Sequence, residues 1–373
     1  MTFLFVLAAI VMLGVMVTVH EAGHFRAARL TGIPVKEFAI GFGPKILSWK
    51  SKKHETQFFL RLIPAGGYCM FYGEDDIAEK EKDDPRSMNN FPVWRRIVTV
   101  FAGPVMNFIL ALVVASSIFL VQGEAVFHCY TVIDSVSPGS PAEQAGFLAQ
   151  DVILAVNGED AAGEDETGRT YKASALIGRY REGDAPLTLT VRRGEETLAL
   201  SAAPRFDESE GRFLLGVSLL PAEAPLVSPV SLPRAIHLGA DYCVEAGGAI
   251  LKSLKDLVTT GKGLAESSGP VGIIKGVAET TQSAAQQSAG SALSVYAQLL
   301  VLISVNLGLF NLLPIPGLDG SRILFLLIEG VRRKPINRKI EAYVYTAGTV
   351  LLLGLMLILT FKDVWNIFRG PGL

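Results

Sequence analysis

Three residues near the N-terminus, His20, Glu21 and His24, form the pattern His-Glu-x-x-His within "HEAGH". On a helix, residues four apart share one face, so the two imidazoles can bind one Zn²⁺. The glutamate of such a pattern does not bind the metal but takes a proton from the water that the metal activates. In the alternative, neighbours satisfy both histidines, which leaves Glu21 without a role. The sequence predicts a zinc site with Glu21 as general base.

This motif ends a segment that is long and apolar enough to enter a membrane. No charged residue occurs from residue 2 to residue 19. Ionisable groups inside a membrane span are costly and are usually functional. A cleaved signal peptide is the alternative, but the segment lacks a basic start and a small-residue cleavage site. We therefore expect a first span over residues 1–26 that carries the zinc motif.

Two histidines leave Zn²⁺ one protein ligand short of a typical catalytic site. Asp319 is the candidate third ligand, in "NLLPIPGLDGSR". Pro314 and Pro316 must end the preceding helix, and a broken helix at membrane depth is tolerated where it lines a cavity. Such a break would bring Asp319 towards His20 and His24. In the alternative, Asp319 only caps a helix or belongs to a turn.

Two asparagines lie in the same region. Asn311 is predicted to hydrogen-bond a substrate backbone or the oxyanion, and Asn306 is a second candidate for substrate binding. For Asn306, a link between helices is the alternative.

The composition indicates a polytopic membrane protein. Half of the 373 residues are hydrophobic, 19% are charged and the mean hydropathy is +0.37, whereas soluble chains carry about 25% charged residues. A net charge of −2 gives no attraction to nucleic acid. Spans of about 20 residues are predicted at 1–26, 97–121, 293–313 and, with the tail, 343–373. The three cysteines have no metal-cluster spacing; a Cys129–Cys243 disulfide stays open.

Basic residues predict the orientation of the spans. Lys and Arg gather after the first span, before the second, and between the third and the fourth, and basic flanking loops stay in the cytoplasm. The ranges 27–96 and 314–342 are then cytosolic, and the segment between the second and third spans lies outside. Lys362 and Arg369 in the external tail run against this bias.

The range 27–96 is predicted to hold short β-strands between residues 35 and 74, broken at "GFGP" and "PAGG". Several runs are apolar, so a hairpin that dips into the membrane and an ordinary cytosolic β-loop are both open. The high charge of segment 74–90 predicts a mobile linker.

The range 122–225 is predicted to be a β-rich domain, with a tight turn at Asn157-Gly158 and a hairpin at Arg193-Gly194. "SPAEQAGFLAQDVILAVNG" resembles the core of a bacterial PDZ domain, a module that binds extended peptides, often C-termini. A spacer without ligand is the alternative. The range 226–292 is predicted to contain an amphipathic helix with Lys252 and Lys255 on its polar side, and a connecting loop with a Gly-Pro turn.

Taken together, "HEAGH", "AGPVMNFILAL", one PDZ-like segment and "NLLPIPGLDG" resemble the site-2 protease family, in its bacterial branch that regulates σ factors. The resemblance covers nearly the whole chain. It implies that His20, His24 and Asp319 bind zinc, that Glu21 is the base and that Asn311 contacts substrate backbone. It also implies that the 35–74 stretch engages substrate as a strand. Known members often carry two PDZ domains, and this chain has room for one.

The sequence thus predicts a four-helix membrane protein with one extracytoplasmic PDZ-like domain and a membrane-associated β-hairpin region. The predicted activity is a zinc intramembrane endopeptidase in the bacterial inner membrane, with its metal towards the cytosol. Single-span membrane proteins, such as anti-σ factors or signal-peptide remnants, are the substrates that the resemblance implies. One alternative is an inactive scaffold that binds peptides through its PDZ domain, which the intact motifs oppose. A zinc-containing transporter is opposed by the lack of an inverted repeat.

Overall fold

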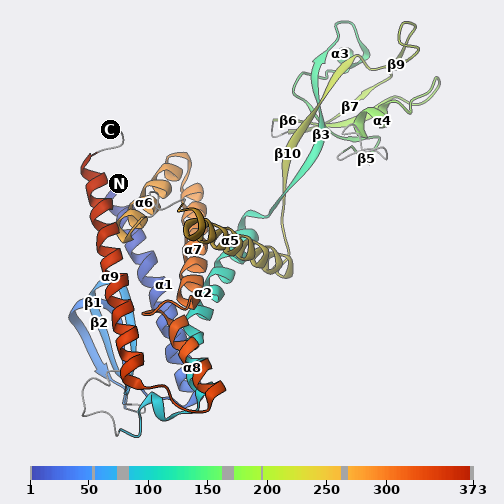
Figure 1. The fold of residues 1–373 in the computed structure, drawn as a ribbon. Helices are drawn as coiled ribbons and strands as arrows, with labels where there is room; N and C mark the ends of the chain where they lie inside the picture. The colour runs from blue at the N-terminus through green and yellow to red at the C-terminus, as the bar shows by residue number, and fades with distance from the viewer. Residues whose placement is uncertain are drawn as a thin grey trace. The chain divides into compact units, whose positions relative to one another are not determined.

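The computed structural model describes residues 2–52, 55–73, 84–161, 172–194, 196–261 and 268–369. The chain forms two compact units, one made of residues 1–121 with 231–373 and the other of residues 122–230. The first unit contains the long helices and the second is rich in β-strands (Figure 1).

Four helices of the described chain are long and apolar enough to cross a bilayer. They are α1 (Thr2–Thr31), α2 (Val93–Gln122), α7 (Ala289–Leu312) and α9 (Arg338–Arg369). At about 1.5 Å per residue, each exceeds the bilayer's hydrocarbon core, which is about 30 Å thick. The prediction of four membrane-spanning helices is confirmed as far as helix length and composition are concerned.

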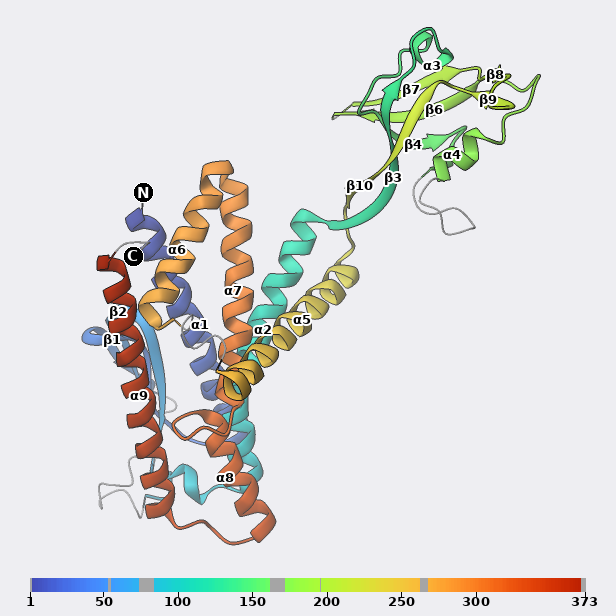
Figure 2. The same cartoon turned by 45° about the horizontal axis from the view of Figure 1, so that its top comes forward.

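Helix α6 (Pro270–Gln287) occupies part of the range predicted as a connecting loop, so that interpretation was wrong. The expected Gly-Pro turn is instead a helix start, because Gly269 is the N-cap and Pro270 stands at the first helical position. Helices α6 and α7 run side by side (Figures 1 and 2). Val277 of α6 packs in one cluster with Met12 and Met16 of α1.

The start of α6 is fastened to α9 by a buried carboxylate. Asp363 is 7% exposed and accepts a hydrogen bond of 2.8 Å from the backbone N–H of Gly272. A side-chain carbon on Gly272 would lie 2.8 Å from Asp363 Oδ1, so only glycine allows this approach.

Helix α5 (Leu232–Thr260) is the predicted amphipathic helix. Its apolar side packs on α2 and α7, where Tyr242, Cys243 and Ile250 join a cluster around Val301 and Val305. Cys243 is a free thiol.

Strands β1 (Val35–Lys50) and β2 (Gln57–Phe71) pair in an antiparallel manner, but each folds back on itself. Residues 37–40 pair both with residues 57–60 and with residues 67–70. Residues 57–60 pair in turn with residues 47–50, so segment 67–71 lies at one edge of a ribbon of four strand segments. The short strands expected from the two glycine-rich breaks are therefore present as segments of two long strands. Of the charged segment 74–90, residues 74–83 lie outside the described residues.

The ribbon exposes large apolar side chains, and more than half of the surface of Ile46, Leu47 and Leu62 is accessible. Its other face packs on α1 and α2, in a core with Val35, Phe71 and Val100. A large exposed apolar patch marks a site of membrane or protein contact, and the membrane hairpin stays a prediction.

Helix α8 (Asp319–Arg332) lies in the range predicted as a cytosolic loop. Glu329 on α8 forms a two-pronged ion pair with Arg96 on α2, with N–O distances of 2.5 and 3.2 Å. The side chains are only 19% and 8% exposed. This pair, together with Leu326 in the core around Val100, fixes α8 against α2.

The second unit is built around one sheet with strand order β10-β3-β4-β6-β7, and β5 pairs with β4. Its elements are β3 (Glu124–Val136), α3 (Pro141–Gln144), β4 (Val152–Val156), β5 (Glu159–Asp160), α4 (Lys172–Ile177), β6 (Leu187–Arg193), β7 (Glu196–Ala202), the separate hairpin β8 (Arg205–Asp207) and β9 (Arg212–Leu214), and β10 (Val217–Ser228). The predicted turn at Asn157-Gly158 and the hairpin after Arg193 are confirmed.

An ion pair between a partly exposed arginine and a buried carboxylate ties β6 to the turn before β4. Asp151 is fully buried, and Arg193 donates to both of its carboxylate oxygens at 2.7 and 2.8 Å. The N–H of Leu148 donates to the same carboxylate. The identification of this β-rich unit as a PDZ domain stays a prediction.

Candidate metal centre

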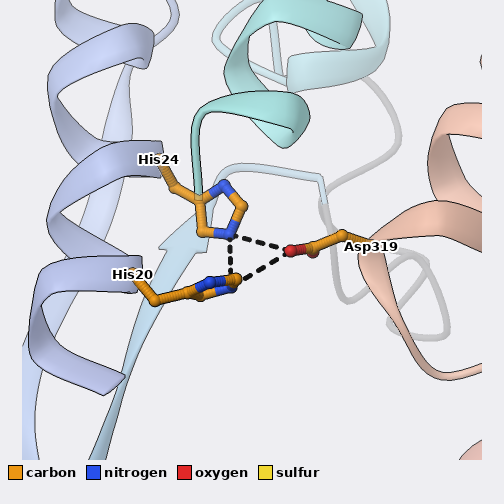
Figure 3. A group of neighbouring side chains, drawn as sticks. All are labelled: His20, His24 and Asp319. Carbon is orange, nitrogen blue, oxygen red and sulfur yellow. Dashed lines mark hydrogen bonds and ion pairs between the residues drawn. The ribbon is translucent and has the colours of Figure 1, made fainter. Parts of the chain in front are cut away.

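The structure brings together His20, His24 and Asp319, the three residues predicted to bind metal (Figure 3). The two Nε2 atoms lie 3.1 Å apart. Oδ2 of Asp319 lies 3.1 Å from Nε2 of His20 and 3.3 Å from Nε2 of His24. Both histidines are buried, at 7% and 6% exposure.

Helix α1 presents both imidazoles to α2, and glycines allow the close approach. A side-chain carbon on Gly23 of α1 would overlap the backbone of Ala102, and one on Gly103 of α2 would overlap His24. The same carbon on Gly103 would lie 2.9 Å from Nε2 of His20. Helix α2 thus approaches α1 most closely at the two glycines.

Helix α2 also contacts the far side of each ring. Nδ1 of His24 lies 2.9 Å from the backbone carbonyl oxygen of Thr99. Nδ1 of His20 lies 3.1 Å from the side-chain amide of Asn107. These contacts were missed by reasoning from the sequence, although Gly103 and Asn107 lie within the quoted motif "AGPVMNFILAL". The spacing of four residues between Gly103 and Asn107, which matches that of the histidines, was the available signal.

Asp319 reaches the site because α7 ends and the chain turns before α8 starts. Helix α7 ends at Leu312, before the two prolines, and Gly317 has a φ of +99°. Asp319 is the first residue of α8. A side-chain carbon on Gly320 would overlap the carbonyls at the end of α7, so glycine is needed for this tight reversal. The alternative role of Asp319, a place in the first turn of a helix, coexists with its place in the cluster.

Glu21 faces the same space, and the backbone of Cys69 hydrogen-bonds its carboxylate. Cys69 belongs to segment 67–71, the edge segment of the β ribbon. Glu21 thus lies between the metal-ligand candidates and an edge of β structure.

A cavity of about 230 Å³ surrounds these residues. Its lining comes from α1, α2, the β ribbon, α7, the turn before α8, and α8 and α9: His20, Glu21, His24, Tyr68, Cys69, Phe71, Val100, Asn311, Gly317, Leu318, Asp319, Arg322 and Tyr345. Asn311 lines it, with one amide hydrogen donated to the carbonyl of Leu307. Asn306 is not among the lining residues, so the structure does not bring it to the cavity.

The donor set fits a zinc ion. Ligands about 2.0–2.1 Å from a tetrahedral zinc lie roughly 3.3 Å apart, close to the separations of the three candidate atoms. Oδ2 of Asp319 is buried and lies within 3.3 Å of both imidazole Nε2 atoms. A buried carboxylate oxygen beside two imidazole nitrogens calls for a cation.

The chain is similar to known proteins over nearly its whole length. Residues 8–355 match peptidase family M50. The chain is 31% identical to the regulator of sigma-W protease RasP of Bacillus subtilis, over 97% of this chain and 99% of RasP. It is 35% identical to a protein named as a zinc metalloprotease in Nostoc sp., over 96% and 95% of the two chains. A protein of Clostridium acetobutylicum with the same kind of name is 33% identical over 98% of each chain.

The family match and the relatives' names define a metallopeptidase, and its candidate metal centre lies among helices long and apolar enough to cross a membrane. The chain belongs to peptidase family M50, the family of the site-2 proteases. The predictions of the family and of a metallopeptidase activity are confirmed.

Proposed function

We propose that this protein is a zinc-dependent intramembrane endopeptidase that cleaves single-span membrane proteins. The observation that carries the proposal is the buried cluster of His20, His24 and Asp319 with Glu21 in the same cavity. The names of the M50 relatives support zinc as the metal.

In this proposal, His20, His24 and Asp319 would hold the ion. Zinc bound there would polarise a peptide carbonyl and lower the pKa of a coordinated water to about 7. Glu21 would accept the proton of the attacking water and pass it to the leaving amide nitrogen. The hydrogen bond from Cys69 would hold the carboxylate of Glu21 in place.

Asn311 and the β ribbon would bind the extended backbone of the substrate. Asn311 keeps an amide oxygen and a second amide hydrogen for this purpose, since one hydrogen is used by Leu307. Segment 67–71 supplies an edge to which a substrate strand can add. We do not extend this role to Asn306, because it is absent from the lining of the cavity.

For the cellular setting, we propose the inner membrane, with the metal towards the cytosol and residues 122–225 outside. The distribution of Lys and Arg around the spans supports this orientation. The printed name of RasP supports a substrate connected with σ-factor control. Anti-σ factors or signal-peptide remnants, trimmed outside the membrane beforehand, are the proposed substrates, and the β-rich unit would act as a PDZ domain that restricts access.

The test is Glu21→Gln in the full chain, assayed in detergent against a single-span substrate. Cleavage should fall by several orders of magnitude while the zinc content stays normal, since Glu21 is not a ligand. The exposed Glu279→Gln is the control and should cleave normally. Undiminished cleavage by Glu21→Gln, or wild-type protein that contains no zinc, would overturn the proposal.

The access role has its own test, deletion of residues 126–222. The shortened protein should cleave substrate that has not been trimmed outside the membrane. A dependence on trimming as strict as that of the full chain would contradict the proposed restriction of access.

A further inference from the structure

Asn107 is a fully buried side chain in the middle of α2, at 0% exposure. Its amide nitrogen lies 3.1 Å from Nδ1 of His20, and its amide oxygen has no hydrogen-bond partner among the described residues. A buried polar atom without a partner costs about 1–3 kcal/mol, so this arrangement requires an explanation.

The hydrogen bond of His24 shows what a metal-binding histidine requires of its neighbour. A histidine that binds a metal through Nε2 carries its proton on Nδ1, and that N–H needs an acceptor. For His24 the acceptor is the carbonyl oxygen of Thr99, which can only accept. His24 is therefore held with Nε2 available to a metal.

The amide of Asn107 can act in either sense on His20. With its NH₂ group towards Nδ1, the amide donates, and the proton of a neutral His20 must then sit on Nε2. That tautomer has no lone pair for a metal. With its oxygen towards Nδ1, the amide accepts from Nδ1–H, and Nε2 is free to bind.

The two ends of a carboxamide are nearly equal in size, so half a turn about its last bond exchanges them at little steric cost. In the orientation with the amide nitrogen towards Nδ1, the amide oxygen has no partner among the residues that the structure describes. Whether Nε2 of His20 carries a proton or binds a metal therefore decides which orientation of the Asn107 amide is favoured.

We propose that Asn107 is a positioning residue of the metal centre, whose amide oxygen accepts the Nδ1–H of His20 when metal is bound. Thr99 and Asn107 then act as a matched pair on α2, one for each histidine. The inference rests on the proposed zinc site and adds the group that selects the metal-binding form of His20. It is carried by the burial of Asn107, its contact with His20 and its unpaired amide oxygen.

The experiment compares zinc affinity, by competition with a chelator, in wild-type protein, Asn107→Leu and Asn107→Asp. Leucine removes the acceptor at similar volume, and loss of such a partner lowers metal affinity about 10–100-fold. Aspartate keeps an acceptor and cannot donate when ionised, so its affinity should stay within a few-fold of wild type. Ser304→Ala is the matched control, because its hydroxyl bonds the backbone oxygen of Asn107 and not the amide.

Two results would overturn the inference. One is an Asn107→Leu variant that binds zinc with wild-type affinity. The other is an Asn107→Asp variant whose zinc affinity falls about 10–100-fold, as expected if the wild-type amide must donate to His20. If the leucine variant does not fold, the aspartate variant alone still separates accepting from donating. Wild-type protein without measurable zinc affinity would instead refute the proposed function, so the two failures are distinguishable. The absorption spectrum of the Co²⁺-loaded variants gives a second readout, since it reports ligand geometry rather than stability.

Discussion

Gly103 of α2 faces His24 of α1 so closely that no other residue type fits between the two helices without displacing the imidazole. The same glycine borders Nε2 of His20 at 2.9 Å from where a side-chain carbon would begin. The packing of the three candidate ligands therefore depends on a residue that contributes no side chain to the cluster.

Gly103→Ala is expected to lower zinc affinity by at least tenfold, because the added methyl group pushes the imidazoles apart. Equilibrium dialysis of the purified protein measures this. Gly354→Ala on α9 is the control, since a side-chain carbon there meets nothing within 4 Å. Equal zinc affinity in the two variants would show that α1 and α2 can move apart freely.

The ion pair between Arg96 and Glu329 should hold α8, and hence Asp319, against α2. Removing one partner of a buried pair leaves an uncompensated charge and costs about 3–5 kcal/mol. Arg96→Met should therefore lower the unfolding temperature in detergent by several degrees and reduce cleavage. Replacing both residues by methionine should recover most of the stability, and a double variant as unstable as the single one would contradict this account.

Asp151 is expected to make the stability of the β-rich unit depend on pH in the acid range. Burial raises the pKa of this carboxyl, but hydrogen bonds from Arg193 and from the N–H of Leu148 outweigh burial and leave the pKa below its ordinary value. A lowered folded pKa stabilises the unit fully above the unfolded value of about 3.9, and this contribution is lost as pH falls through the folded value.

Asp151→Asn should flatten this acid dependence, measured as hydrogen exchange of β4 and β6 in the full chain. The exposed Asp134→Asn makes the same change of charge elsewhere and serves as the control. An acid profile unchanged in Asp151→Asn would show that other groups carry the loss of stability.

Asp363 fastens α9 to the start of α6. A hydrogen bond to a charged group contributes about 1.5–3 kcal/mol, so Asp363→Leu should lower the free energy of unfolding by about that amount. Faster hydrogen exchange at Gly272 would locate the effect. Glu279→Gln, which breaks an exposed pair with Lys275 at 3.7 Å, should cost less than about 1 kcal/mol. Similar losses in both variants would argue against a specific role for the buried contact.

The sequence was sufficient for the four long helices, because apolar length is a local property. It was also sufficient for His20, His24 and Asp319 as one group, because a helical spacing and a proline break can be read directly. Helix α6 was missed because its Gly-Pro start suggested a turn and its Gly and Thr residues favour a helix weakly, whereas packing against α1 and α7 stabilises it. The pairing of residues 37–40 with two segments at once depends on tertiary register.

The contributions of α2 to the site could not be derived from spacing alone. Gly103 and Asn107 matter through what lies opposite them, and that depends on how α1 and α2 cross. Asn306 shows the reverse case. A polar residue in an apolar helix suggested a functional role, yet Asn306 is not among the residues that line the cavity.

The cavity draws on α1 at one end of the chain and on α8 and α9 at the other. During synthesis, His20 and His24 leave the ribosome first, and Asp319 follows only after most of the chain. At about 5–20 residues per second, roughly 15 to 60 s separate the two events. A nascent chain in that interval has a glutamate and two histidines in the bilayer but lacks the third ligand. A candidate site arranged in this way is complete only after α8 and α9 have been synthesised and packed against α1.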